Sequence, residues 1–180
     1  MDNYMPMGTT GRHNNLVGTF FSAIVDLLRK KEASAFHEEC ALTYLGTKKE
    51  SMGFKLVDIN SIDDRKRFIE KTMPLLETVQ PDFMLFKDNL YLKNENDTRW
   101  AGQPDLIVEV WSESNSHQDR TFKMNLYATS PITEHWYIEQ DSNKVECYIG
   151  SERLPDQCLT NILKTQKGLE FDLRYLAIES

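Results

Sequence analysis

The sequence lacks the signatures of several common enzyme classes. It contains no G-x-x-x-x-G-K-[ST] loop, no G-x-G-x-x-G turn and no G-x-S-x-G elbow. Its four histidines (13, 37, 117 and 135) show no zinc-type spacing with one another or with cysteine. These absences weigh against nucleotide hydrolysis on a P-loop, hydride transfer on a Rossmann fold and serine hydrolysis. Carboxylates are therefore the leading candidates for any chemistry.

Cysteines and long apolar runs are also scarce. Cys40, Cys147 and Cys158 are an odd number without C-x-x-C spacing, which is typical of reduced thiols. No apolar run approaches the roughly 20 residues that a membrane-spanning helix needs. The first ten residues lack the basic and apolar regions of a signal peptide. We therefore expect a cytoplasmic protein that does not cross a membrane.

The length and the net charge limit the number of domains and the class of function. At 180 residues the chain is long enough for one domain with a proper core, and we expect a single domain over 1–180. The formal net charge of −7 argues against a protein that coats nucleic acid, because such proteins usually carry a basic footprint. It is compatible with an enzyme that touches DNA locally, since a bound metal ion offsets the charge of an acidic cluster.

Hydrophobic periodicity predicts an α/β domain with a mixed central sheet. The first helix is indicated by Leu16, Phe20 and Ile24, which recur at helical spacing after Asn14 or Asn15 as a cap. The predicted helices cover 14–31, 61–73 and 118–128, the predicted strands 36–45, 53–59, 82–86 and 105–111, the predicted hairpin 135–149, and a final strand or short helix lies within 168–178.

Acidic residues stand at the start and in the middle of the most apolar stretches. "PDFMLF" (81–86) holds Asp82, and "PDLIVEVWSES" (104–114) holds Asp105 and Glu109. Asp105 and Glu109 are four residues apart on one strand, about 13 Å along the backbone, which is too far to share one cation. If the two strands pair antiparallel, Asp82 comes beside Glu109 with the strands about 4.8 Å apart. Asp82 and Glu109 are thus the pair best placed to hold one Mg²⁺ or Mn²⁺.

A metal-assisted reaction on a phosphodiester also benefits from a nearby cation. Trp111, two residues past Glu109, cannot supply one, and the nearest substitute is Lys123 in the following helix. The alternative is that Lys123 pairs with Asp119 one turn earlier on the helix surface.

Three further residues are secondary candidates. Asp105 either bonds the backbone at the strand entry or belongs to the site. Glu38 lies on the apolar face of its predicted strand and is a candidate third metal acid. Ser112 either bonds the backbone at the strand-to-helix turn or helps to position a phosphate.

In order and spacing, the motifs over 81–148 resemble the Uma-two family of putative restriction endonucleases, which is grouped with the PD-(D/E)XK nuclease superfamily. His13 also resembles a histidine common in that family before the first helix. The matching segments are Pro81-Asp82, Pro104 to Ser112, Asp119, Lys123, Tyr127, Glu134 to Glu139 and Val145 to Tyr148.

The resemblance implies a restriction-endonuclease-like core, a mixed sheet flanked by helices, and a divalent-metal site built from Asp82 and Glu109. It places the motif lysine at position 111, where this chain has tryptophan, so Lys123 would be a migrated lysine. The resemblance also implies a homodimer. Three functions are open: a metal-dependent DNA endonuclease, a nuclease-fold protein that no longer cuts and binds nucleic acid or protein instead, or a metal-dependent enzyme that acts on RNA or a nucleotide.

Overall fold

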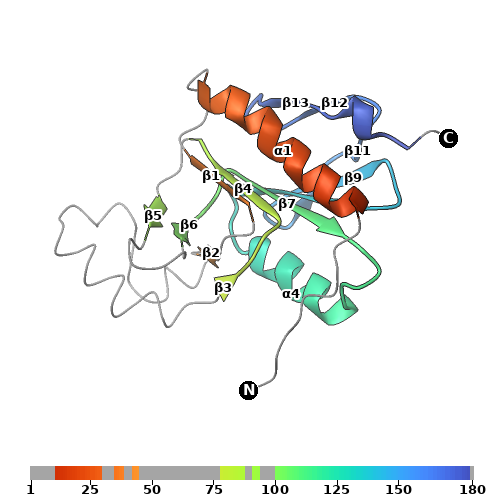
Figure 1. Cartoon of the computed structure of the whole chain (residues 1–180). Coiled ribbons are helices and arrows are strands. Elements are labelled where there is room, and N and C mark those ends of the chain that lie inside the picture. Colours follow the sequence, from red (N-terminus) through yellow and green to blue (C-terminus); the bar gives the residue numbers. More distant parts are fainter. Residues whose placement is uncertain are drawn as a thin grey trace, which may run out of the picture.

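The computed structural model describes residues 11–29, 35–38, 42–44, 78–87, 91–93 and 100–178. Figure 1 shows a mixed sheet with one helix across each face. Helix α1 (Gly11–Arg29) lies on one side and helix α4 (His117–Tyr127) lies on the other. This is the expected α/β class with a mixed central sheet between helices.

The main sheet has seven strands in the described part of the chain, in the order β1-β4-β7-β8-β9-β10, with β11 also paired to β9. Strands β4 and β7 are antiparallel, whereas β7 and β8 are parallel and are connected through α4. The strands of this sheet are β1 (Ala35–Glu38), β4 (Phe83–Phe86), β7 (Leu106–Trp111), β8 (Glu134–Glu139), β9 (Lys144–Ile149), β10 (Glu152–Arg153) and β11 (Gln157–Cys158).

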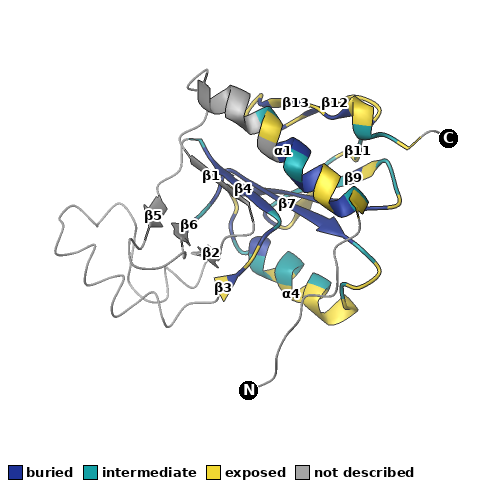
Figure 2. Cartoon of the chain, viewed as in Figure 1, coloured by how far each residue is buried: buried dark blue, intermediate teal, exposed yellow. Residues whose placement is uncertain are grey.

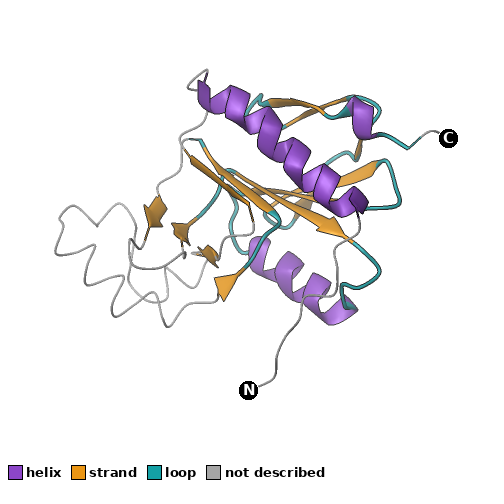
Figure 3. Cartoon of the chain, in the orientation of Figure 1, coloured by secondary structure: helices purple, strands orange, loops and turns teal. Residues whose placement is uncertain are grey.

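Smaller sheets and one short helix complete the described elements, as Figure 3 shows. The second sheet has the order β3-β2-β6-β5, and β12 pairs with β13 near α1. Their bounds are β2 (Leu42–Tyr44), β3 (Thr78–Val79), β5 (Tyr91–Lys93), β6 (Trp100–Gly102), β12 (Ile162–Lys164), β13 (Glu170–Asp172) and the 3₁₀ helix η4 (Arg174–Leu176).

Alternation along the buried strands divides the core between the two faces of the sheet. Phe83, Leu106 and Val108 belong to the cluster on the α1 side, whereas Ile107 and Trp111 belong to the cluster on the α4 side. Figure 2 shows the buried residues concentrated in the central strands and the inward faces of the helices. Each fully buried large apolar side chain contributes about 1.5–3 kcal/mol.

Most of the predicted elements are present at nearly the predicted bounds. The strands over 82–86 and 105–111, the helix over 118–128 and the hairpin over 135–149 are confirmed to within a residue or two. The tail forms both alternatives, a strand at 170–172 and then a short helix at 174–176. The predicted strand over 53–59 and the predicted helix over 61–73 lie outside the described residues.

Two predictions were wrong in detail. The stretch 36–45 is not one strand, because β1 pairs with β4 in the main sheet and β2 pairs with β6 in the second sheet. The first helix begins at Gly11, so Asn14 and Asn15 are exposed residues inside it and do not cap it. Arg12 explains the earlier start, because its side chain donates to the carbonyl oxygens of Gln140 and Leu176 and so fixes the first turn.

Candidate functional site

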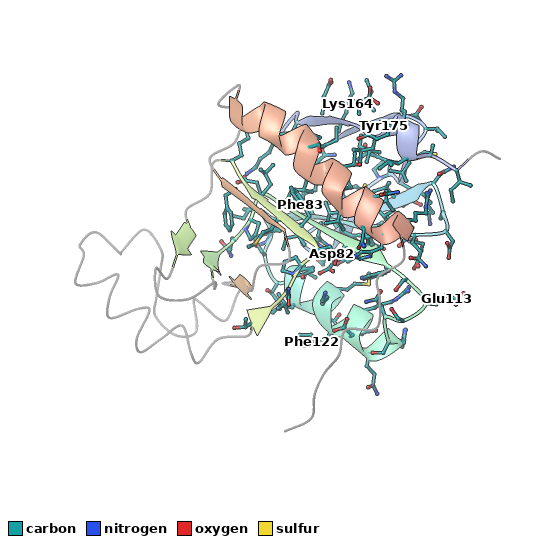
Figure 4. All side chains as sticks on the ribbon, viewed as in Figure 1. Asp82, Phe83, Glu113, Phe122, Lys164 and Tyr175 are labelled. Atoms are coloured by element: carbon teal, nitrogen blue, oxygen red, sulfur yellow. The ribbon has the colours of Figure 1, made fainter. Side chains whose placement is uncertain are left out.

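The site lies where the antiparallel pair β4 and β7 ends. Phe83 is paired with Val108, and the next position along each strand is occupied by Asp82 and Glu109. The predicted juxtaposition of these two acids is therefore present. Asp82 Oδ2 accepts a hydrogen bond of 2.7 Å from the backbone N–H of Val110, which fixes its carboxylate against β7. Figure 4 shows Asp82 at the end of the sheet, between α1 and α4.

Glu109 is enclosed on the α4 side of the sheet, with only 1% of its surface exposed. Lys123 Nζ lies 2.9 Å from Glu109 Oε2, and the Tyr127 hydroxyl donates to Glu109 Oε1 at 2.6 Å. Lys123 also donates to the backbone carbonyl oxygen of Gln80 at 3.1 Å. Because α4 runs back along β7, two residues one helical turn apart reach the same carboxylate.

Burial and charge act on this carboxylate in opposite directions. Burial raises the pKa of Glu109 to about 7; the positive charge of Lys123 opposes the rise and the negative charge of Asp82 adds to it. Burial works against the charge on Lys123, but Glu109 and Asp82 outweigh it, so the pKa of Lys123 lies above its ordinary value. The site therefore holds a carboxyl group that titrates near neutral pH beside a firmly charged ammonium group.

Helix α1 contributes a histidine from the opposite side. His13 Nε2 lies 3.6 Å from Asp82 Oδ1, and the Asp82 side chain is 19% exposed. The side chains of Asp82, Glu109, Lys123, Tyr127 and His13 thus come together at one end of the sheet.

Carboxylate oxygens are the ligands that Mg²⁺ and Mn²⁺ prefer, and Asp82 and Glu109 are the residues that could hold such an ion. No group of three His, Cys, Asp or Glu side chains able to hold a metal occurs among the described residues. A pair of acids still fits Mg²⁺, because this ion is usually bound by one or two protein carboxylates and takes its remaining ligands from water and substrate phosphates.

Of the secondary candidates, Asp105 lies at the other end of β7 and Ser112 lies in the turn before α4. Asp105 accepts from the backbone N–H of Lys87 at 2.7 Å and pairs with Lys167, so it joins two loops at the other end of β7. Ser112 Oγ contacts Ser114 Oγ at 2.6 Å within the turn before α4. Glu38 is opposite Phe83 in β1, and its side chain lies outside the described part of the structure.

Sequence reasoning missed the contribution of Tyr127. The residue is fully buried and looks like an ordinary core aromatic, yet its hydroxyl bonds Glu109. The signal that could have identified it is its position four residues after Lys123, which places both side chains on one helix face. Lys123 itself pairs with Glu109, from α4 to the strand beneath it, rather than with Asp119 alone on the helix surface.

The comparisons with known proteins agree with this architecture. Residues 62–177 match the family model Uma2, described as "Putative restriction endonuclease". The chain belongs to the Uma2 family. The resemblance found in the motifs is therefore confirmed, and membership of this family supports a nuclease.

One solved structure shows the same fold. It is the crystal structure of "a putative nuclease belonging to DUF820" from Anabaena variabilis ATCC 29413, with a TM-score of 0.60 and 14% sequence identity. The match covers 98% of this chain and 86% of that one. No curated protein matches. No helix among the described residues is both long and apolar enough to cross a membrane.

Proposed function

We propose that the protein is a divalent-metal-dependent DNA endonuclease of the PD-(D/E)XK type, with Asp82 and Glu109 as metal ligands and Lys123 as the catalytic cation. The observation that carries the proposal is the 2.9 Å contact between Lys123 Nζ and Glu109 Oε2. It supplies a cation at the acid pair although the usual position, 111, holds tryptophan.

Mg²⁺ or Mn²⁺ held by Asp82 and Glu109 would supply an acidified water and offset the charge of a phosphodiester. The surrounding residues prepare these ligands. The Val110 N–H orients the Asp82 carboxylate, and the Tyr127 hydroxyl holds one oxygen of Glu109. Each carboxylate oxygen has a second lone pair, so these bonds leave room for a metal.

Lys123 has the position and the charge to act on the reacting phosphate. Its side chain is 13% exposed, so the ammonium group is largely removed from water while its charge is maintained by Glu109 and Asp82. Electrostatic stabilisation is stronger in such a site than in bulk water. We infer that Lys123 orients the attacking water or stabilises the charge that develops on the phosphate.

Cleavage of supercoiled plasmid DNA with Mg²⁺ or Mn²⁺ tests the proposal. Glu109→Gln and Lys123→Met should each lower the rate about 10²–10³-fold, the usual effect of removing one electrostatic group from an active site. Lys164→Met is the matched control, because Lys164 pairs with Glu170 on the exposed surface. Cleavage that survives in Glu109→Gln would mean a contaminating nuclease or another site.

A second candidate is a nuclease-fold protein that binds nucleic acid or protein without cutting. Trp111 favours it, because a buried indole occupies the position of the motif lysine. Metal-independent DNA binding by wild type, with no cleavage under any metal, would support this candidate.

We also propose a homodimer in a reducing cytoplasm. Cys147 and Cys158 are free thiols, which fits such a compartment. Light scattering coupled to size exclusion tests the oligomeric state, and a mass of one chain, 21.0 kDa, at micromolar concentration would contradict the dimer.

A further inference from the structure

Three buried N–H donors have no hydrogen-bond partner in the described part of the chain. They are Arg12 Nη2, Trp111 Nε1 and Arg120 Nε, and no other buried side-chain nitrogen or oxygen there lacks a partner. Leaving a buried donor unpaired costs about 1–3 kcal/mol, so each such group calls for an explanation. All three atoms are donors, and two of them belong to guanidinium groups.

Each of these donors belongs to a residue at the carboxyl ends of the parallel strands β7 and β8. Arg12 reaches this end from α1, where its Nε donates to the carbonyl oxygen of Gln140. The Gln140 N–H donates in turn to the carbonyl oxygen of Trp111 at 2.8 Å. Ligands of open α/β sheets bind outside the carboxyl ends of parallel strands.

Arg120 reaches the same end from α4. Its guanidinium carbon lies 4.8 Å from the centre of the Trp111 ring, and its Nη2 donates to the carbonyl oxygen of Ser112 at 2.6 Å. The indole is 6% exposed and stacks on Tyr137, with 4.4 Å between the ring centres. The two helices therefore deliver one arginine each to the strand ends, with the indole of Trp111 packed beneath Arg120.

Arg12 and Arg120 bring two positive charges to these strand ends. Glu139 pairs with Arg120 and offsets one guanidinium, while the charge of Arg12 remains, since Arg12 bonds backbone carbonyls. Unpaired N–H donors on two guanidinium groups and an indole suit a ligand that is anionic and only accepts hydrogen bonds. Phosphate meets both conditions, and arginine is its preferred partner.

The cluster is close to the acid pair. Trp111 is two residues past Glu109 on the same face of β7, about 7 Å along the strand. That distance is of the order of one nucleotide step. We propose that Arg12, Trp111 and Arg120 form a subsite for the nucleic-acid phosphate next to the one held at Asp82 and Glu109. This inference rests on the proposed nuclease function and names a substrate contact for it.

The indole N–H resonances of ¹⁵N-labelled protein provide a direct test. Inorganic phosphate and a short DNA duplex are titrated without divalent metal, with sodium chloride at matched ionic strength as the salt control. The Trp111 signal, assigned by its loss in Trp111→Phe, should shift downfield and saturate with both probes. The Trp136 signal should stay, because its Nε1–H already bonds Glu134 Oε1 at 2.7 Å.

DNA affinity measured by fluorescence anisotropy gives a second readout. Trp111→Phe removes the N–H together with the five-membered part of the indole and keeps a six-membered aromatic ring, and it should weaken binding about 3–10-fold. Arg120→Gln should weaken DNA binding at least as much. It should also reduce the slope of log affinity against log salt concentration by about one. Arg153→Gln removes the same charge from an exposed position paired with Asp156, so it should bind like wild type.

The outcomes separate this subsite from the proposed activity. The subsite is contradicted if the Trp111 resonance does not shift with either probe, or shifts as much with sodium chloride. This holds even if plasmid cleavage is robust. A signal that responds to phosphate but not to DNA overturns the nucleic-acid assignment. A saturable response to DNA, with no cleavage by any metal-loaded preparation, supports the subsite and contradicts the proposed nuclease activity.

Discussion

Lys123 and Glu109 form a buried ion pair, Nζ to Oε2, between residues that are fourteen positions apart on a helix and a strand. The strand position two residues past the acid holds Trp111, so the helix provides the cation that the strand does not. This arrangement leads to predictions on stability as well as activity.

Removing the lysine should destabilise the protein more at pH 8 than at pH 5. Lys123→Met removes the charge that opposes the rise of the Glu109 pKa, so at pH 8 the buried Glu109 must either stay ionised without its partner or take up a proton, a loss of about 3 kcal/mol. At pH 5 Glu109 is protonated in the folded state, since its pKa is about 7, and the loss is smaller. Urea unfolding at both pH values measures the difference. The double variant Lys123→Met/Glu109→Gln should recover most of the stability, and equal losses at both pH values would contradict the prediction.

Neutralising the buried acid should remove a loss of stability that wild type shows as the pH rises. The pKa of Glu109 is about 7 in the folded state against 4.5 for the free group, because burial disfavours the charge. Its contribution to the free energy of unfolding is therefore complete below pH 4.5 and is lost as the pH rises through 7. The total loss is about 3 kcal/mol. Relative to wild type, Glu109→Gln should gain stability between pH 5 and pH 8. The exposed substitution Glu152→Gln serves as the control, and a constant difference over this range would count against the prediction.

His135 should make the protein less stable as the pH falls, whereas Glu109 makes it less stable as the pH rises. Burial lowers the pKa of His135 from 6.5 to about 4. Nε2 faces the Gly150 carbonyl oxygen and so carries the proton, and Nδ1 accepts from the Tyr137 hydroxyl. The unfolded chain binds a proton between pH 6.5 and 4 while the folded one does not, so about 3 kcal/mol is lost as the pH falls through this range. His135→Phe should be less stable at pH 7 but should show a shallower decline between pH 6.5 and 4.

Two glycines offer a matched test of backbone strain. Gly150 has φ of +55°, and an added Cβ would lie 3.2 Å from Pro131 Cα and from the Ser130 carbonyl oxygen. Gly168 has φ of +79° but open space around its Cβ position. Gly168→Ala should therefore cost about 1 kcal/mol, from the left-handed backbone alone. Gly150→Ala should cost about 2–3 kcal/mol because it adds a clash. Thermal unfolding of both variants checks the order.

Asp105 should be needed for stability but not for cleavage. It joins the backbone of Lys87 to the side chain of Lys167, at the other end of β7 from Asp82. Asp105→Asn weakens the ion pair and should cost about 1–2 kcal/mol. The cleavage rate per folded molecule should stay within about twofold of wild type. A 100-fold loss of rate in a folded Asp105→Asn preparation would show instead that this acid belongs to the site.

The acid pair could be predicted from sequence because strand geometry has few free parameters. A side-chain period of two, an antiparallel pairing and a Pro-Asp start are enough to bring Asp82 beside Glu109. The position of Lys123 could also be predicted, because a helix of this length that follows β7 must return over the sheet. Local sequence patterns are therefore enough to predict that these three side chains come together.

Other features depend on contacts that local patterns do not encode. The alternation over 36–45 runs through two strands that belong to different sheets, and only their partners β4 and β6 separate them. The start of α1 depends on Arg12 reaching residues 140 and 176, more than a hundred positions away. The gathering of Arg12, Trp111 and Arg120 depends on the same long-range packing.

The acids and the cation of the candidate site are held by different kinds of structure. Asp82 and Glu109 are fixed by adjoining strands of a hydrogen-bonded sheet, whereas Lys123 is carried by α4, of which Tyr127 is the buried residue. Central strand pairing is among the most protected parts of a fold, and a helix on the surface of the sheet is less protected. A brief detachment of α4 would take the ammonium and the tyrosine hydroxyl away together and leave two facing carboxylates in register. The position of the two acids is thus set by the sheet, whereas their charge balance is set by how α4 is seated on it.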